Sequence, residues 1–219
     1  TRKESSAASD VYKRQVLNLV IGFHLADGGK VLLDGNDMRK IDLRTYRKHL
    51  AVVPQTSILF SGTIRENITY GNEHVSDEEL ERVIKAANLT DLMESLPNGV
   101  DTMVGEHGGK LSGGQRQALT LLMATLQKPK LLLLDEHTAA LDPKTAAKVL
   151  DITDRIVNRD HLTTLMITHN MKDAIAHGNR LIMMMNGKII LDIQGEEKKK
   201  LTVKPVSYTH LTLPTTPYV

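Results

Sequence analysis

Residues 111–136 read LSGGQRQALTLLMATLQKPKLLLLDE. The first part of this stretch has the pattern of a helix, and the last part has the pattern of a strand. Ser112 and Gln115 have the spacing of a capping box, which opens a helix that we expect to end near Gln127. The four leucines at 131–134 are typical of a parallel strand buried on both faces. A capped helix that leads into such a strand is typical of an α/β protein.

The same alternation continues on both sides of this stretch. Further strands are expected at residues 30–34, 51–54, 162–168, 181–185 and 188–193. Further helices are expected to begin at or just after Asp42, Ser76, Thr90, Asp142 and Asn170. Strands that alternate with helices predict a mainly parallel sheet covered by helices.

Composition narrows the classes of function. The chain has 219 residues, 41% of them hydrophobic, which is enough to bury a core. It has no cysteine, so disulfides and thiolate metal sites are excluded. The formal net charge of +2 does not favour nucleic acid as a partner. No run approaches the roughly 18 apolar residues that a membrane span requires.

The two ends of the chain have an unusual composition. Residues 5–15, SSAASDVYKRQ, and residues 206–215, VSYTHLTLPT, are similar to translations of the two strands of one transposase sequencing adapter. We therefore expect 1–15 and 206–219 to be adapter-derived and disordered, and 16–205 to form one domain. Removing the four basic and two acidic residues of the first flank leaves 24 of each sign, so this domain is formally neutral.

Two groups of residues in the quoted stretch can carry chemistry. Ser112, Gly113 and Gly114 stand at a helix N-terminus, whose N–H groups and dipole suit a phosphate, although such a cap can also be only a tight turn. Asp135 and Glu136 follow the buried strand, at the end where α/β sheets bind ligands. Asp135 can hold Mg²⁺ and Glu136 can orient or deprotonate a water, although an acidic pair after a strand can also cap a helix.

Four motifs follow one another in the chain: LSGGQ at 111–115, LLLLDE at 131–136, ALD at 140–142 and ITH at 167–169. In this order and spacing they resemble the ATP-binding cassette (ABC) family. The resemblance extends from residue 16 to about residue 203. It implies an α/β fold like that of P-loop NTPases, with a mainly parallel sheet and a helical signature subdomain.

The resemblance also implies roles for the matched residues. Asp135 and Gln55 would bind Mg²⁺, and Gln55 would sense a membrane domain. Glu136 would be the catalytic base, and His169 would contact the γ-phosphate of ATP. The signature would contact ATP bound to the opposite subunit, and Asp142 would lie at the interface of that dimer. The signature residues that bind this cofactor are Ser112, Gly113, Gly114 and Gln115.

The implied function is ATP binding and hydrolysis that powers an ABC transporter, with ATP and Mg²⁺ as cofactors. The implied partners are the transmembrane domains of the transporter and a second ATP-binding domain, and nucleic acid is not among them. The implied location is peripheral, on the cytoplasmic face of the plasma (inner) membrane. Two alternatives stay open: a truncated or chimeric fragment without ATPase activity, and an ABC ATPase that acts outside transport.

The chain departs from the family at the P-loop, because the motif G-x-x-x-x-G-K-[ST] occurs nowhere in its 219 residues. Lys13 falls by register where the loop lysine would stand, but the glycines around it are missing. Charge-assisted bonds to phosphate contribute roughly 1.5–3 kcal/mol each, so losing three weakens ATP binding about a thousandfold. We therefore expect that this chain does not hydrolyse ATP.

The two halves look like different branches of the family. Residues 53–68 and 104–106 resemble exporters, whereas residues 118–123, 136–138 and 168–173 resemble the separate ATPase subunits of import systems. We hypothesise that two genes were joined near the codons for LSGGQRQ.

Three further features have simple interpretations. Asn67-Ile-Thr69 fits a glycosylation sequon, which we expect to be accidental. The methionines at 183–185 are expected to pack within a strand. The lysine run at 198–200 is expected to be solvated on the surface.

Overall fold

The computed structural model of the chain describes residues 14–71, 75–86 and 89–202. Val16–Ile167 form one compact unit, and a second unit begins at Thr168. The flanks that we expect to be adapter-derived lie outside the described residues, apart from residues 14 and 15. Those two are helical, within a helical segment that covers residues 14–21.

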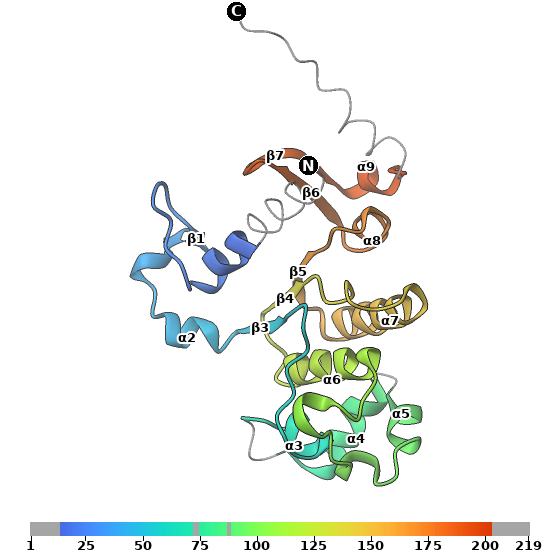
Figure 1. Cartoon of the computed structure of the whole chain (residues 1–219). Coiled ribbons are helices and arrows are strands. Elements are labelled where there is room, and N and C mark those ends of the chain that lie inside the picture. Colours follow the sequence, from blue (N-terminus) through green and yellow to red (C-terminus); the bar gives the residue numbers. More distant parts are fainter. Residues whose placement is uncertain (1–13, 72–74, 87–88, 203–219) are drawn as a thin grey trace, which may run out of the picture. The chain divides into compact units, whose positions relative to one another are not determined.

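The first unit is built on a sheet of three parallel strands (Figure 1). These strands are β3 (Leu50–Val53), β4 (Leu131–Asp135) and β5 (Thr163–Ile167), in the order β3-β4-β5. Val53 is paired with Leu134 and Asp135 with Ile167, so all three carboxyl ends lie at one edge of the sheet. The central strand is buried at positions 132–134, which confirms the prediction from its leucines.

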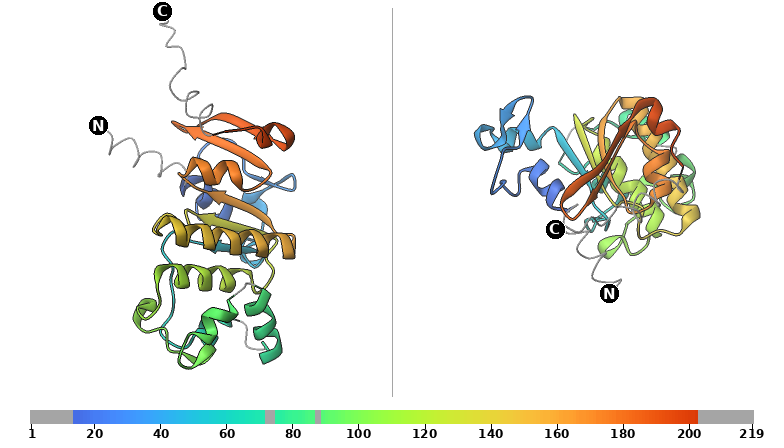
Figure 2. Two further views of the ribbon diagram at one scale, coloured as in Figure 1. Left: turned by 90° about the vertical axis from the view of Figure 1, so that its right-hand side faces the viewer. Right: turned by 90° about the horizontal axis from the view of Figure 1, so that it is seen from above.

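Two helices form a layer beside this sheet. They are α6 (Gly113–Thr125), which contacts β3, and α7 (Pro143–Asp160). Figures 1 and 2 show α6 and α7 side by side. Both begin with the predicted caps, Ser112 for α6 and Asp142 for α7, and α7 has proline at its first position.

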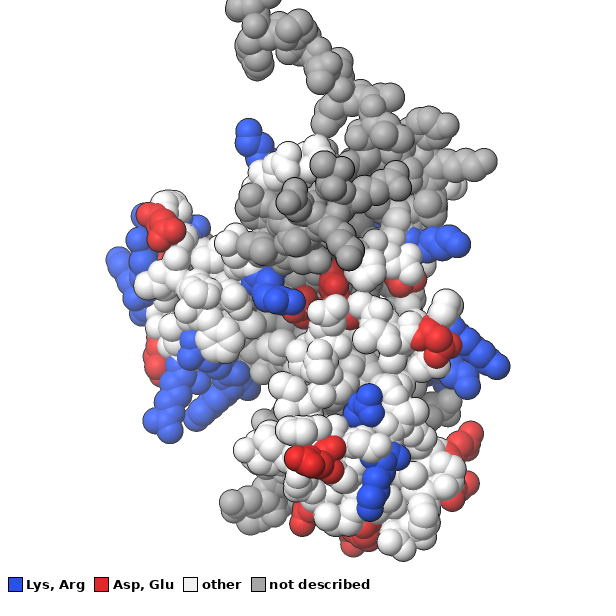
Figure 3. Space-filling model, in the orientation of Figure 1, with Lys and Arg blue, Asp and Glu red and all other residues white. Residues whose placement is uncertain are grey.

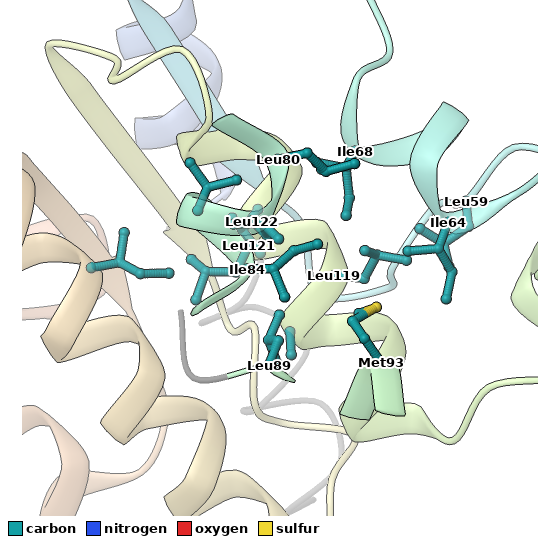
Figure 4. Packing of buried hydrophobic residues seen from close by; sticks show 14 of the residues in the cluster. Leu59, Ile64, Ile68, Leu80, Ile84, Leu89, Met93, Leu119, Leu121 and Leu122 are labelled. Carbon is teal, nitrogen blue, oxygen red and sulfur yellow. The ribbon is translucent and has the colours of Figure 1, made fainter. Parts of the chain in front are cut away.

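A group of short helices packs against α6 and matches the predicted helical subdomain. Its helices are α3 (Ile64–Ile68), α4 (Asp77–Ala86), α5 (Thr90–Glu94), η2 (Gly99–Asp101) and η3 (Glu106–Gly108). Their apolar side chains meet those of α6 in one core (Figure 4), whose labelled members are Leu59, Ile64, Ile68, Leu80, Ile84, Leu89, Met93, Leu119, Leu121 and Leu122.

The N-terminal part of this unit contains a small hairpin. The hairpin is formed by β1 (Leu32–Leu33) and β2 (Asn36–Asp37). Two short helices follow it, η1 (Met38–Lys40) and α2 (Leu43–Arg47). Asp34 (φ 49°) and Gly35 (φ 81°) form the turn, as predicted from a dipeptide that favours two positive φ angles. Lys and Arg side chains gather over this part of the molecule in Figure 3; the exposed ones are Lys30, Arg39, Lys40, Arg44, Arg47 and Lys48.

The second unit is a hairpin with two short helices. It contains α8 (Met171–Ala176), β6 (Arg180–Met185), β7 (Lys188–Gln194) and α9 (Gly195–Lys199). β6 and β7 are antiparallel and are joined at the predicted turn, Asn186-Gly187, where both φ angles are positive. None of the described helices in either unit is both long and apolar enough to cross a membrane.

The prediction of a solvated lysine run was wrong for its first residue. Lys198 is buried, with 4% of its surface exposed. Its Nζ donates to the carbonyl oxygens of Ile175, His177 and Gly178 at 2.6, 2.7 and 3.0 Å. Helix α8 ends at these residues, and the last carbonyls of a helix need donors from outside it. The Lys198 ammonium supplies those donors. The positive charge of this side chain was therefore not a sufficient reason to predict that it is exposed.

Candidate functional site

Gln55 and Glu136 meet at the carboxyl edge of the parallel sheet. Gln55 follows β3 by two residues, and Glu136 follows β4 directly. The Gln55 Nε2 atom donates to Glu136 Oε2 over 3.5 Å, the long end of the hydrogen-bond range. Residues 81 positions apart in the sequence are thus brought together by the pairing of their strands.

The backbone of Glu136 is in the left-handed region, with φ 47°. A residue other than glycine costs about 1 kcal/mol or more there, so the surrounding structure must hold it. Its N–H donates to the carbonyl oxygen of Ile167 at 3.0 Å, and its own carbonyl accepts from Ala139 N–H at 2.9 Å. These bonds fasten the turn after β4 to the end of β5. Backbone strain of this kind is concentrated at functional sites.

Asp135 is the last residue of β4 and is half-buried. With Glu136 and the amide oxygen of Gln55, it offers the oxygen donors that Mg²⁺ prefers. Within the described residues, His, Cys, Asp and Glu side chains form no group of three or more that could hold a metal. This set fits a magnesium ion that takes its remaining ligands from water and nucleotide phosphates, as such ions usually do.

The signature segment caps helix α6 as the sequence predicted. Ser112 Oγ accepts from Gln115 N–H at 3.3 Å, and Gln115 Oε1 accepts from Ser112 N–H at 2.7 Å. The two hydrogen bonds of this capping box do not involve the N–H groups of Gly113 and Gly114, which belong to the first turn of α6. A helix of 13 residues with a glycine-rich first turn is suited to bind an anion at that end.

Asp142 caps helix α7 close to the signature. Its Oδ1 accepts from the N–H groups of Lys144 and Thr145, both at 3.1 Å. The pKa of Asp142 is lowered, first by hydrogen bonding with the side chain of Thr145 and then by these backbone donors. The residue expected at a dimer interface therefore has a structural function within its own helix.

Sequence reasoning missed Gln117, which links the signature helix to the Gln55 segment. Gln117 is on α6 and is 3% exposed. Its Nε2 donates to the carbonyl oxygen of Pro54 at 3.3 Å, and its Oε1 accepts from the hydroxyl of Ser57. The sequence did contain a sign of this role. Gln117 falls among the apolar positions of the predicted helix, and a side-chain amide buried there needs hydrogen-bond partners.

His137 is a second buried polar residue that sequence reasoning left without a role. It is 2% exposed, and its Nε2 lies 3.1 Å from Thr153 Oγ1. Thr153 donates its own hydroxyl hydrogen to the carbonyl of Val149 at 2.8 Å. The Thr153 oxygen is therefore the acceptor, and the histidine carries its proton on Nε2. This bond ties the segment after Glu136 to α7.

His169 belongs to the second unit, just before α8. Asn170 caps α8 by accepting from Lys172 N–H at 3.0 Å, and Thr168 Oγ1 accepts from Asn170 N–H at 3.0 Å. These bonds shape the turn that carries His169. Its contact with a γ-phosphate stays a prediction.

The asparagine of the sequon is buried, and its side chain is hydrogen-bonded to the backbone. Asn67 is 1% exposed; its Oδ1 accepts from Phe60 N–H at 2.8 Å, and its Nδ2 donates to the carbonyls of Phe60 and Thr63, both at 2.9 Å. A side chain buried in three bonds cannot carry a glycan in the folded protein. This is consistent with the expectation that the sequon is accidental.

A parallel sheet with a carboxylate pair at its carboxyl edge, beside a helix with a glycine-rich first turn, is the arrangement of an ATP-binding α/β domain of the P-loop NTPase class. The family model for ABC transporters matches residues 13–139, more than half of the chain. The chain belongs to the ABC transporter family and carries part of its ATP-binding domain, which powers transport by ATP hydrolysis across the family. The matched range includes Gln55, the signature and Glu136.

Curated relatives include members of different kinds. The chain is 39% identical to the ABC-type transporter fsqE of Aspergillus fumigatus, over 81% of this chain and 14% of that protein. It is 38% identical to a tyrosine transport ATP-binding protein of Clostridioides difficile, over 89% of this chain and 79% of that protein. It is 36% identical to an ATP-dependent lipid A-core flippase of Syntrophus aciditrophicus, over 81% of this chain and 29% of that protein.

The fold also matches a solved structure, that of a bacterial Atm1-family ABC exporter with ATP bound. The TM-score is 0.73 at 33% identity, over 83% of this chain and 32% of the exporter. The exporter, the flippase and fsqE are therefore about three to seven times longer than the stretch they share with this chain.

Proposed function

We propose that these residues are the hydrolytic half of a transporter ATPase site, which closes around ATP at the carboxyl edge of β3 and β4. The observation that carries the proposal is the meeting of Gln55 and Glu136 beside Asp135. An amide and two carboxylates at this edge can orient a water and hold a magnesium ion next to a terminal phosphate.

Each residue has a distinct part in this proposal. Glu136 accepts a hydrogen bond from Gln55, and the same carboxylate would orient and deprotonate the attacking water. Asp135 and Gln55 would hold Mg²⁺, which would neutralise charge on the phosphates when it is bound. His169 would contact the γ-phosphate.

The signature would act on a second ATP-binding domain. The first-turn N–H groups of Gly113 and Gly114, with Ser112 and Gln115 around them, would contact the γ-phosphate of ATP held by that partner. Asp142 would stand at the interface. Closure of the two domains on ATP and their release after hydrolysis would drive the transporter.

We propose transmembrane domains as the other partner, with the chain at the cytoplasmic face of the plasma membrane. An exposed apolar surface supports the contact with such a partner. Phe60 and Tyr70 stack with ring centroids 4.3 Å apart and an interplanar angle of 21°. Both are exposed, as are Ile58 and Met103, and Met103 pairs with Thr63 across a β-bridge. Contiguous exposed aromatic and aliphatic side chains mark a protein contact. We propose that a cytoplasmic segment of the transmembrane domains covers them.

One observation favours a second candidate, an ABC fragment without turnover of its own. The sequence has no P-loop motif, and this loop supplies most of the amide donors to the phosphates. On this proposal the residues named above keep their arrangement but receive no nucleotide.

The two candidates are separated by adding the loop. The P-loop segment of the Clostridioides difficile relative is joined before Val16, and Glu136→Gln is made in the same chain. We expect Mg²⁺-dependent ATP hydrolysis, and in the variant a loss of at least about a hundredfold in kcat with ATP binding retained. Equal turnover of the two proteins would remove Glu136 from the role of base. Absence of ATP binding in both would favour the inert fragment.

A further inference from the structure

The signature end of α6 packs against the start of α7 with no room for a side chain at residue 114. A Cβ atom built on Gly114 would lie 2.3 Å from the Cγ2 methyl of Thr145. Gly114 is within helix α6 and is not one of the glycines with a positive φ. Backbone torsion therefore does not require glycine at this position, whereas the contact with Thr145 does.

Thr145 cannot easily move its methyl group away. Its N–H donates to Asp142 Oδ1 at 3.1 Å. Its side chain lies on the side of this carboxylate, where it helps to hold the pKa of Asp142 below the usual value. Threonine is branched at Cβ, so turning χ1 to withdraw the methyl would also move the hydroxyl off Asp142. The same residue thus faces the signature with one branch and the Asp142 cap with the other.

We propose that Thr145 is a positioning residue that sets the spacing between Ser112 and Asp142, and that it makes glycine obligatory at residue 114. The spacing is fixed by a contact between two helices of one chain before any nucleotide arrives. The functional meaning rests on the proposed function, in which the signature and Asp142 face the same partner. The contact itself is testable without ATP.

The test is thermal unfolding of the 219-residue chain, with Gly114→Ala made in three backgrounds: the parent, Thr145→Ser and Thr145→Val. Alanine is the better helix former, so without a clash it would raise the unfolding midpoint. With Thr145 present we expect the midpoint to fall by about 5 °C, because overpacking outweighs the gain in helix propensity. In the Thr145→Ser background, which keeps the hydroxyl and removes the methyl, we expect no fall.

Two controls separate the methyl from other causes. Thr145→Val keeps a methyl at the Cγ2 position and removes the hydroxyl, so Gly114→Ala should still lower the midpoint there. Gly113→Ala places its Cβ 3.2 Å from Leu141 Cδ2, so Thr145→Ser should not change its effect. Hydrogen exchange of the amides at 113–116 should rise in Gly114→Ala and return to the parent rate with Thr145→Ser.

An equal fall of the midpoint in the parent and Thr145→Ser backgrounds would overturn the proposal, and so would a rise for Gly114→Ala alone. If Gly114→Ala does not fold, recovery of folded protein in the double variant supports the proposal and no recovery contradicts it. Failure of the ATP experiment above would leave these results unchanged, because no nucleotide is present in them.

Discussion

Single residues show how much depends on partners that lie far away in the sequence. The cation of Lys198 is buried against three carbonyl oxygens, while the neighbouring Lys199 stays exposed and pairs with Glu196 at 2.6 Å. Burial lowers the pKa of Lys198, since the charged form gives up solvation. Two adjacent lysines in one short helix therefore differ in their contribution to stability.

Replacing Lys198 by methionine should lower the free energy of unfolding by about 2 kcal/mol. The apolar stem is kept, but the carbonyls at the end of α8 lose a donor with three bonds. Urea unfolding of the 219-residue chain measures the difference. Lys199→Met is the matched control and should change stability by no more than about 0.5 kcal/mol. Similar losses in the two variants would contradict the capping role.

Among the elements, α6 makes specific contacts at several points along its length. Near its N-terminus Gly114 meets Thr145 of α7, and one turn later Gln117 meets the carbonyl of Pro54 and the hydroxyl of Ser57. On its other side apolar residues join the core of the short helices. The signature helix is thus connected to the segments that carry Asp142 and Gln55.

The Gln117 contact should appear as a coupling between Gln117→Leu and Ser57→Ala. Ser57→Ala leaves the buried Oε1 of Gln117 without this donor, Gln117→Leu leaves the half-buried hydroxyl of Ser57 without this acceptor, and the double variant removes both groups. We expect an interaction energy of about 1 kcal/mol in a double-mutant cycle measured by urea unfolding. Thr120→Ala, one turn further along the helix, is the control and should be additive with Ser57→Ala. Additivity within about 0.3 kcal/mol for Gln117 and Ser57 would show that this contact does not stabilise the fold.

Elements with a local signal were predicted well, and those that depend on tertiary contacts were not. Helix caps, the leucine strand and the Asn186-Gly187 turn depend on neighbouring residues, so the bounds of β4, β7 and α6 and the start of α7 were predicted close to those observed. The strand at 30–34 was predicted too long; only Leu32–Leu33 is paired, with a partner two residues long. The bonds of Gln117 and Lys198 join segments about 20 to 60 residues apart, and no sequence period encodes them.

The candidate site was predicted from motifs, and the structure brings two of the predicted residues, Gln55 and Glu136, into contact. Strand pairing explains why Gln55 reaches Glu136, and this could be anticipated because parallel strands end at one edge of a sheet. The left-handed backbone of Glu136 could not be anticipated, since the residue type gives no sign of it.

At the scale of the whole molecule, the chain combines a Gln55–Glu136 contact at the sheet edge with a sequence that has no P-loop motif. We expect the 219-residue polypeptide to release no phosphate from Mg²⁺-ATP above background, because the remaining residues cannot replace the amide donors of that loop. Phosphate release by the purified chain, with Glu136→Gln as the reference, measures this. Turnover that disappears in Glu136→Gln would refute the expectation.

The mixed ancestry of the two halves stays a hypothesis. A lipid A-core flippase, the ABC-type transporter fsqE and a tyrosine transport ATP-binding protein match the chain at similar identity, 36% to 39%. Unbroken sequencing reads from codon 100 to codon 130 would argue against a join near the signature.

The conformation at Glu136 also bears on which substitutions evolution can try at that position. Glycine and asparagine adopt a positive φ angle readily, whereas valine, isoleucine and threonine do so at a higher energetic cost. Substitutions at this position are therefore selected by their effect on the backbone as well as by their chemistry. Lineages that lose catalysis could therefore be expected to drift toward glycine or asparagine there, so that a degenerate copy would preserve the shape of the turn after its carboxylate is gone.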